Sequence, residues 1–152
     1  MKSLSSTKKS TLSLSKPRVD GESLRAISIT KFSQLYERKI IDSAGYKYAL
    51  VTDVSSYFPS IYTHSIPWAL YGKNESKANL KSNVNNLGDE IDRYCRNIQD
   101  GQTIGLPIGS DTSHIISEII GTAIDCELKN KLDKNLIGFR YVDDFFCFSR
   151  KE

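Results

Sequence analysis

Two adjacent aspartates interrupt a β-favouring aromatic segment near the end of the 152-residue chain. In residues 137–148, Phe139 and Tyr141 alternate with other residues before Asp143 and Asp144, and more aromatic residues follow. Aromatic residues favour strands, whereas aspartate is common in turns. We therefore predict a β-hairpin that carries both carboxylates at its bend.

A third aspartate ends another β-favouring run. Residues 48–54 read Tyr-Ala-Leu-Val-Thr-Asp-Val and predict a buried strand that ends at Asp53. Pro59 closes this segment, and Ser60 is expected to begin a helix. The end of a strand can present a charge to a cleft without burying it, and the hairpin could bring its two carboxylates beside this one.

The other periodic segments predict helices. Residues 32–41 have a helical pattern, and apolar residues at steps of three and four predict an amphipathic helix over residues 76–98. The glycine-rich residues 101–109 predict a loop, after which Ser110 or Asp111 is expected to cap a long helix. This order predicts an α+β fold, an antiparallel sheet with helices packed on one face.

Composition narrows the class of protein. The first 50 residues hold ten Lys/Arg against four Asp/Glu in a chain of net charge +3, which fits a nucleic-acid enzyme or simply a solvated tail. Residues 1–20 are expected to form a flexible basic tail without the apolar core of a secretory signal, so we expect a cytoplasmic protein. The absence of an apolar run of roughly 18 residues argues against a membrane partner. Cys95, Cys126 and Cys147 lack the spacing of a disulfide framework or a zinc site.

Asp53, Asp143 and Asp144 suit divalent-metal chemistry if the fold gathers them. Carboxylates within a few ångströms of one another repel, which raises some of their pKa values unless a cation neutralises them. Hard oxygen ligands select Mg²⁺ or Mn²⁺, and two such ions about 3.5–4 Å apart stabilise the attacking and leaving oxygens of phosphoryl transfer. The alternative is that the adjacent pair of aspartates is an ordinary turn.

Three motifs in order resemble those of reverse transcriptases, the RNA-directed DNA polymerases. Tyr-Val-Asp-Asp at residues 141–144 resembles the catalytic hairpin, and residues 53–58 resemble the first catalytic motif, an aspartate followed five residues later by an aromatic. Gly-Leu-Pro-Ile-Gly at residues 105–109, followed by Ser113, resembles the loop-helix motif between them. Three ordered motifs are a far more specific signal than one tetrapeptide.

Within that superfamily the chain is most similar to bacterial abortive-infection and defence-associated reverse transcriptases. The similarity covers roughly residues 48–148, about two thirds of the chain, and includes residues 57–70, 101–109, 111–113 and 139–141. Retroviral and intron enzymes usually carry glutamine at the position of Ile108. This departure points toward the defence group.

The resemblance implies a polymerase palm with a two-metal site. Asp53 and Asp143 would ligate both Mg²⁺ or Mn²⁺ ions, Asp144 would complete the cluster, and the backbone carbonyl of Val54 would be a further ligand. Phe58 would be a steric gate that excludes a 2′-hydroxyl; the alternative is an ordinary buried aromatic.

The resemblance also implies contacts with substrates. Pro107, Ile108 and Gly109 would line the nucleotide and template site, while Tyr141 and Val142 would support the primer strand. Each of these residues could instead serve only the turn or the strand that contains it.

The expected activity is deoxynucleotide transfer to a 3′-hydroxyl, in bacterial antiviral defence. Expected partners are dNTPs and nucleic acid, as an RNA template and a DNA product, or a protein primer; an oligomer is also compatible. Residues 21–152 would form a partial reverse transcriptase domain with abbreviated fingers and no thumb. Two alternatives are a template-independent nucleotidyltransferase and a truncated, non-catalytic palm fragment that acts as a binding subunit.

Overall fold

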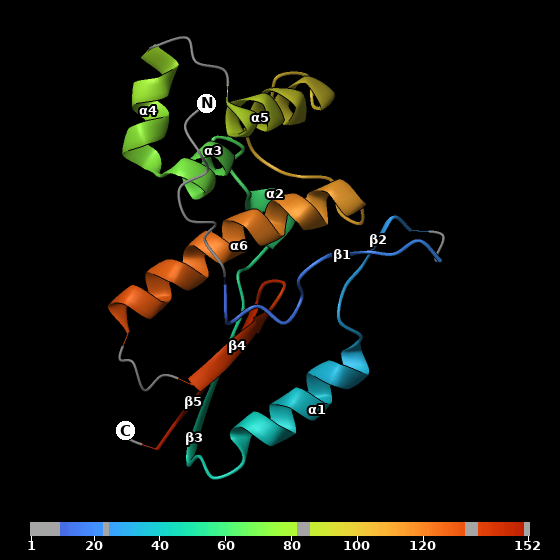
Figure 1. The fold of residues 1–152 in the computed structure, drawn as a ribbon, viewed down its shortest axis with the longest axis vertical. Helices are drawn as coiled ribbons and strands as arrows, with labels where there is room; N and C mark the ends of the chain where they lie inside the picture. Colours follow the sequence, from blue (N-terminus) through green and yellow to red (C-terminus); the bar gives the residue numbers. More distant parts are fainter. Residues whose placement is uncertain (1–9, 23–24, 82–85, 133–136, 151–152) are drawn as a thin grey trace.

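The computed structural model describes residues 10–22, 25–81, 86–132 and 137–150 (Figure 1). In chain order, the helices and strands are β1 (Arg18–Val19), β2 (Ile27–Ser28), α1 (Phe32–Ser43), β3 (Tyr48–Thr52), α2 (Tyr57–Ser60), α3 (Ser65–Tyr71), α4 (Lys73–Lys81), α5 (Leu87–Ile98), α6 (Asp111–Lys131), β4 (Ile137–Tyr141) and β5 (Asp144–Ser149). This mixture of helices with small antiparallel sheets confirms the α+β class at that coarse level.

The main sheet has three antiparallel strands in the order β3-β5-β4. Tyr141 pairs with Asp144, so Val142 and Asp143 form a two-residue turn between β4 and β5. The predicted hairpin is therefore confirmed, with Asp143 in its turn and Asp144 at the start of β5. At the other edge of the sheet, the Arg140 N–H donates to the Leu12 carbonyl at 2.9 Å and the Leu14 N–H donates to the Arg140 carbonyl at 2.8 Å.

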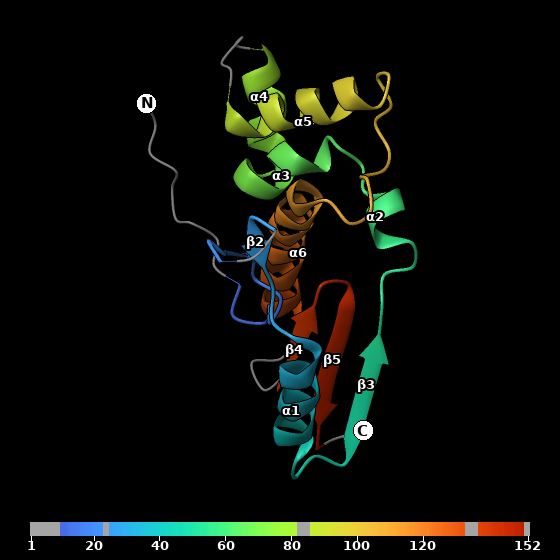
Figure 2. The ribbon, with the colours of Figure 1, turned by 90° about the vertical axis from the view of Figure 1, so that its right-hand side faces the viewer.

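The prediction that residues 48–54 form a buried strand was half wrong. The strand exists as β3, but four of its five residues are exposed, and Leu50 and Val51 keep 62% and 52% of their surface. In the described part of the chain, β3 pairs only with β5, and Figure 2 shows it beside β5, outside the area that α1 crosses. A run of apolar, β-favouring residues indicates a strand, but whether the strand is buried depends on which other elements pack against it.

Helices lie on both faces of the sheet, not on one. Leu35 of α1 packs in a core with Phe139, Tyr141, Phe146 and Phe148. Successive strand residues point to opposite faces, so Arg140 points away from this core, and its side chain meets α6. The sequence showed which segments are helical but not the face against which each one packs.

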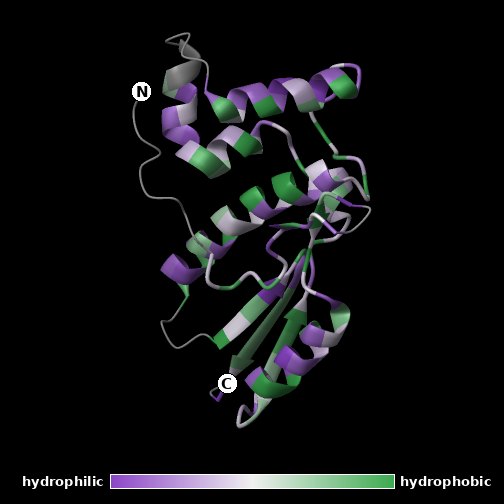
Figure 3. Ribbon diagram, turned by 45° about the vertical axis from the view of Figure 1, so that its right-hand side comes forward, coloured by the Kyte–Doolittle hydropathy of each residue, from purple (hydrophilic) through white to green (hydrophobic). Residues whose placement is uncertain are grey.

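A second core joins the helices to the sheet. It contains Tyr57, Ile61, Ile66, Leu106 and Ile116, and α3 packs against α4, α5 and α6. Figure 3 shows hydrophobic residues concentrated on the strands, with hydrophobic and hydrophilic residues alternating along α5. Within the described residues, no helix is long and apolar enough to span a membrane.

Helix boundaries differ from the predictions in two places. The helix predicted over residues 76–98 is divided into α4 and α5, and the side chain of Asn86 caps α5 by accepting the Asp89 N–H at 3.0 Å. Ser60 ends α2 instead of beginning a helix. The helix starts before Pro59, because a proline is tolerated in the first helical turn, where its missing N–H is not needed. The predicted cap of α6 is confirmed, since Ser110 accepts the Ser113 N–H at 3.1 Å.

The expected flexible tail ended at residue 20, but residues 10–16 are part of the fold. Ser10 and Ser15 keep only 4% and 3% of their surface, and Leu12 is also buried. These residues lie alongside β4, to which their backbone is hydrogen-bonded, and they reach α6, where the Ser10 hydroxyl donates to Asp125. Residues 1–9 of the expected tail lie outside the described residues.

Candidate functional site

The β3–β5 ladder brings the two aspartate-bearing segments to one end of the sheet. Thr52 pairs with Phe145, so Asp53, one residue after Thr52, and Asp144, one residue before Phe145, come together. Burial raises the pKa of Asp144, and the negative charges of Asp143 and then Asp53 raise it further, against the opposing charge of Lys39. Asp53 and Asp143 are therefore both near enough to Asp144 for their charges to affect its protonation.

The cluster is open to solvent and loosely arranged. Asp53 is exposed, whereas Asp143 and Asp144 are half-buried. Within the described residues, no group of three or more His, Cys, Asp or Glu side chains is close enough to hold one metal ion. Carboxylate oxygens are nevertheless the donors that Mg²⁺ prefers, and it commonly takes only one or two from the protein and the rest from water and phosphate. The donor chemistry thus fits an ion shared with a phosphate-bearing substrate, not a closed protein cage.

The turn that carries Asp143 has an unfavourable backbone. Val142 has φ of 55°, a left-handed conformation that is an outlier for a β-branched residue. Both of its peptide groups are held: the N–H donates to Ser15 Oγ at 2.8 Å, and the carbonyl accepts from Arg140 Nη1 at 2.7 Å. The side chain packs between the two cores.

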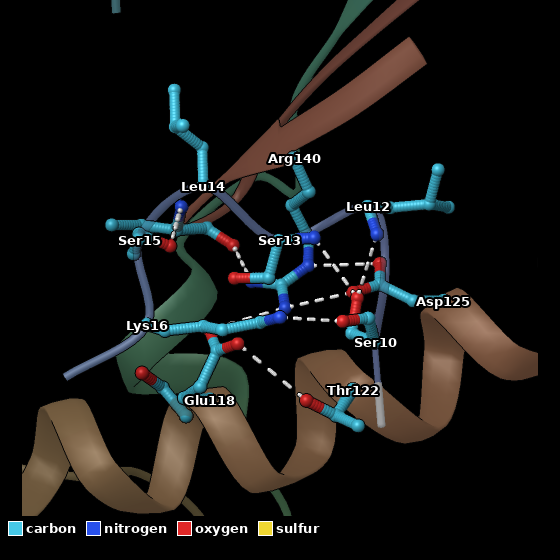
Figure 4. Close-up of polar contacts among 12 residues, drawn as sticks. Ser10, Leu12, Ser13, Leu14, Ser15, Lys16, Glu118, Thr122, Asp125 and Arg140 are labelled. Carbon is cyan, nitrogen blue, oxygen red and sulfur yellow. Dashed lines mark hydrogen bonds and ion pairs between the residues drawn. The ribbon is translucent and has the colours of Figure 1, made fainter. Parts of the chain in front are cut away.

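Arg140 connects this turn to α6 (Figure 4). Its guanidinium is 1% exposed and donates to Asp125 and to Glu118, the latter at 3.1 Å. Ser10 Oγ donates to the same Asp125 carboxylate at 2.5 Å, and Lys16 Nζ donates to the Ser10 carbonyl at 2.6 Å. The N-terminal residues, the hairpin and α6 therefore form one polar network.

The first and second motifs are hydrogen-bonded to each other. The Leu106 N–H donates to the Phe58 carbonyl at 2.9 Å, and the Gly105 N–H donates to the Ile61 carbonyl at 2.8 Å. Leu106 is buried and anchors the loop, while Pro107, Ile108 and Gly109 are exposed. The φ of 90° at Gly109 favours glycine there.

Arg25 fixes the end of the same loop. Its Nη2 donates to the Gly109 carbonyl at 2.8 Å, and its Nε donates to Asp111 Oδ1 at 2.7 Å. The ion pair with Arg25 lowers the pKa of Asp111. The loop is thus held from both sides while residues 107–109 remain accessible.

Phe58 is half-buried between two other rings. Its ring lies edge-on to Tyr57 and to His114, with centroid distances of 5.6 and 5.4 Å. His114 is itself half-buried against Phe58. This packing fixes the plane of the Phe58 ring.

Tyr57 and Val54 support the site from the core. Burial raises the pKa of Tyr57 to about 12, and the charge of Asp143 contributes to this rise. The Tyr57 hydroxyl donates to the Ser117 carbonyl at 2.8 Å. The Val54 side chain packs against the second core.

Tyr141 is a core residue in this arrangement. It is 5% exposed, its ring lies 5.4 Å from that of Phe32, and its hydroxyl donates to the Thr30 carbonyl at 2.8 Å. The side chain therefore fixes the hairpin from inside, on the face of the sheet that α1 covers.

Sequence reasoning missed the network around Arg140. The available signal was a single cation between Phe139 and Tyr141 in a β-favouring run, where alternation places it on the opposite face from both rings. A buried arginine needs carboxylate partners, and Asp125 stands between the apolar Ile124 and Cys126 in the predicted long helix. No comparable pattern marks Ser15, whose role depends on a contact between distant segments.

Comparisons with known proteins give no family. No protein-family model matches the sequence, and no curated protein matches it. The function is therefore inferred from the chain's own residues and their arrangement.

Proposed function

We propose that the chain is the palm of an RNA-directed DNA polymerase, which transfers deoxynucleotides to a 3′-hydroxyl at Asp53, Asp143 and Asp144. One observation carries the proposal: the pairing of Thr52 with Phe145 joins an aspartate-ended strand to a doubly acidic turn. The raised pKa of Asp144 is in keeping with it: burial is the main cause, and the repulsion from Asp143 and Asp53 that adds to it would be relieved by a bound cation.

Each carboxylate has a role in this proposal. Asp53 and Asp143 would hold two Mg²⁺ or Mn²⁺ ions, with Asp144 completing the cluster and the Val54 carbonyl as a further ligand. When bound, the ions would neutralise charge on the transferred phosphoryl group. The protein's own contribution is positioning, since phosphoryl transfer needs little covalent chemistry from side chains.

The neighbouring segments would select the nucleotide. The Phe58 ring, held edge-on by Tyr57 and His114, would lie under the incoming sugar and leave no room for a 2′-hydroxyl. The exposed residues 107–109 would contact the nucleotide and the template, and the absence of a Cβ at Gly109 lets the backbone approach a ligand closely. The setting suggested by the resemblance is antiviral defence in the bacterial cytoplasm.

A primer-extension assay tests the activity. The full chain is incubated with Mg²⁺ or Mn²⁺ and labelled dNTPs, either with poly(rA)/oligo(dT) or without template. We expect metal-dependent incorporation that needs the homopolymer and falls by about 10²-fold or more in Asp143→Asn. Asp100→Asn is the matched control, because Asp100 is an exposed aspartate at the end of α5.

Other outcomes separate the alternatives. Incorporation that is independent of template identifies a template-free nucleotidyltransferase using the same carboxylates. Equal incorporation by wild type and Asp143→Asn overturns the assignment of the site. No incorporation and no Mn²⁺ binding by the wild type favours a non-catalytic binding subunit.

A further inference from the structure

Residues 10–16, here called the N-terminal strap, lie between the hairpin and α6. The strap makes two hydrogen bonds with the backbone of Arg140. The Leu12 carbonyl accepts the Arg140 N–H, and the Leu14 N–H donates to the Arg140 carbonyl. Thr30 Oγ1 donates to the Leu14 carbonyl, and Ser10 Oγ accepts the N–H groups of Leu12 and Ser13 at 3.0 and 2.9 Å. The position of the strap relative to β4 is therefore fixed at several points before Ser15.

Ser15 projects from this strap onto the turn that carries the acidic pair. It keeps 3% of its surface, and its hydroxyl oxygen accepts the Val142 N–H at 2.8 Å. Among the described strands, none supplies an acceptor for this N–H, because Val142 lies in the turn beyond the Tyr141–Asp144 pair. An N–H that folding removes from water and leaves without an acceptor destabilises the fold, so the Ser15 hydroxyl stabilises this turn geometry.

The conformation held in this way is one that valine disfavours. A residue with a side chain disfavours the left-handed region because its Cβ approaches the following carbonyl oxygen, and branching at Cβ makes the position worse. Such strain persists only where the surroundings determine it. At Val142 those surroundings are the Ser15 hydroxyl on the N–H and the Arg140 guanidinium on the carbonyl.

We propose that Ser15 is a positioning residue for the acidic turn: by holding Val142 in its left-handed conformation, it sets the directions of Asp143 and Asp144 and thereby the affinity of the site for a divalent cation. The cation part rests on the function proposed above. Ser15 itself is no ligand, since its hydroxyl is used by the Val142 N–H. Its effect reaches the cation only through the backbone of the turn.

The strap supplies a matched control. Ser13 is two residues away, and its hydroxyl oxygen is buried without a hydrogen bond to any described residue. Ser13→Ala therefore removes the same atom from the same segment without releasing the turn. Ser15→Thr keeps an acceptor oxygen and is the conservative variant.

Mn²⁺ titration of the full chain, with free Mn²⁺ measured by electron paramagnetic resonance, is the primary test. We expect Ser15→Ala to weaken Mn²⁺ binding by about 10- to 100-fold, as removal of an outer-shell partner commonly does, while Ser13→Ala leaves it unchanged and Ser15→Thr restores most of it. Amide exchange at Val142, followed by NMR without metal, should accelerate in Ser15→Ala and not in Ser13→Ala.

A double variant keeps the proposal testable if Ser15→Ala folds poorly. Glycine adopts positive φ without cost, so Ser15→Ala/Val142→Gly should recover Mn²⁺ affinity that Ser15→Ala lost. Mn²⁺ binding by Ser15→Ala equal to that of the wild type overturns the positioning role and leaves the proposed function standing. A wild type that binds no Mn²⁺ overturns the proposed function and the cation part together. An unchanged rate of amide exchange at Val142 in Ser15→Ala overturns the claim that Ser15 holds the turn.

Discussion

The guanidinium of Arg140 donates to both carboxylate oxygens of Asp125, at 2.9 and 3.0 Å, and each side chain is 1% exposed. Two buried charges are costly to remove from water, and their attraction offsets that cost only when the remaining donors and acceptors are also satisfied. Here Glu118 and the Val142 carbonyl accept from the guanidinium, while Ser10 donates to the carboxylate. The pair therefore belongs to a network that joins the strap, the hairpin and α6.

Removing the carboxylate from this pair should destabilise the fold strongly. Asp125→Ala leaves the Arg140 charge buried without its main partner, so we expect a loss of about 3–5 kcal/mol in the free energy of unfolding, measured by urea denaturation followed by circular dichroism. The control is Asp42→Ala, which breaks an i,i+4 pair with a half-exposed Arg38 and should cost about 0.3–0.5 kcal/mol. Similar losses in both variants would contradict a buried network.

Gly121→Ala should destabilise the protein although alanine is the better helix former. A Cβ at this position of α6 would lie 2.6 Å from Arg140 Cζ, and the guanidinium cannot move without leaving its partners. We expect a loss of about 1–3 kcal/mol from overpacking, against the gain of about 1 kcal/mol that helix propensity alone gives. Gly21→Ala, where a Cβ meets nothing within 4 Å, is the control for thermal denaturation. A higher Tm for Gly121→Ala would contradict the close packing.

The parts of the fold that the sequence predicted are those governed by local preferences. Alternating aromatic residues around an acidic pair specify a hairpin, and Ser110 before a periodic segment specifies a helix start. The meeting of Asp53 with Asp144 was predicted because both segments favour strand and both end at a carboxylate. The three ordered motifs supplied the reason to pair them.

The remaining features depend on contacts between distant segments. The exposure of β3 depends on which helices cover it, and the helix faces depend on where Arg140 finds its carboxylates. The packing of Ser10 and Ser15 could not be predicted, because a Ser- and Lys-rich composition is typical of solvated tails and carries no signal for a single long-range hydrogen bond.

Asp144→Asn should stabilise the metal-free protein at neutral pH. Burial and the neighbouring carboxylates raise the folded-state pKa of Asp144 above its ordinary value of 3.8, so the folded state binds this proton more tightly and wild-type stability falls as pH rises through the raised pKa. Asparagine removes both the partly buried negative charge and its repulsion from Asp143 and Asp53, and we expect a gain of about 0.2–1 kcal/mol, the range for neighbouring like charges. The gain should disappear at pH values where the wild-type carboxyl is protonated.

Divalent metal should reverse the order of stability of the wild type and Asp144→Asn. If the site binds Mn²⁺, the cation raises the Tm of the wild type more than that of Asp144→Asn, because the variant lacks the carboxylate that completes the cluster. Asp100→Asn is the control for a general effect of removing one negative charge. An equal Mn²⁺-induced shift in Asp144→Asn would exclude Asp144 from the site.

Tyr57→Phe should lower stability in a pH-dependent way. Without the hydroxyl, the Ser117 carbonyl loses the donor that Tyr57 supplies, which should cost about 0.5–1.5 kcal/mol at neutral pH. The folded pKa of about 12 lies above the unfolded value of 10.0, so the neutral phenol stabilises the fold below pH 10, and this contribution is lost as pH rises toward 12. The stability difference between wild type and variant, from urea denaturation, should therefore shrink above pH 10; a constant difference would contradict the raised pKa.

Phe58→Val should change the choice of sugar more than the rate of synthesis with dNTPs. If the ring lies under the incoming nucleotide, a smaller side chain admits the 2′-hydroxyl, and the ratio of ribonucleotide to deoxynucleotide incorporation should rise by about 10-fold or more. The measurement compares kcat/KM for paired dNTP and rNTP substrates in primer extension. Tyr94→Val, which shortens an aromatic that is 59% exposed on α5, is the control. An unchanged ratio with reduced stability would show that Phe58 serves only the packing of Tyr57 and His114.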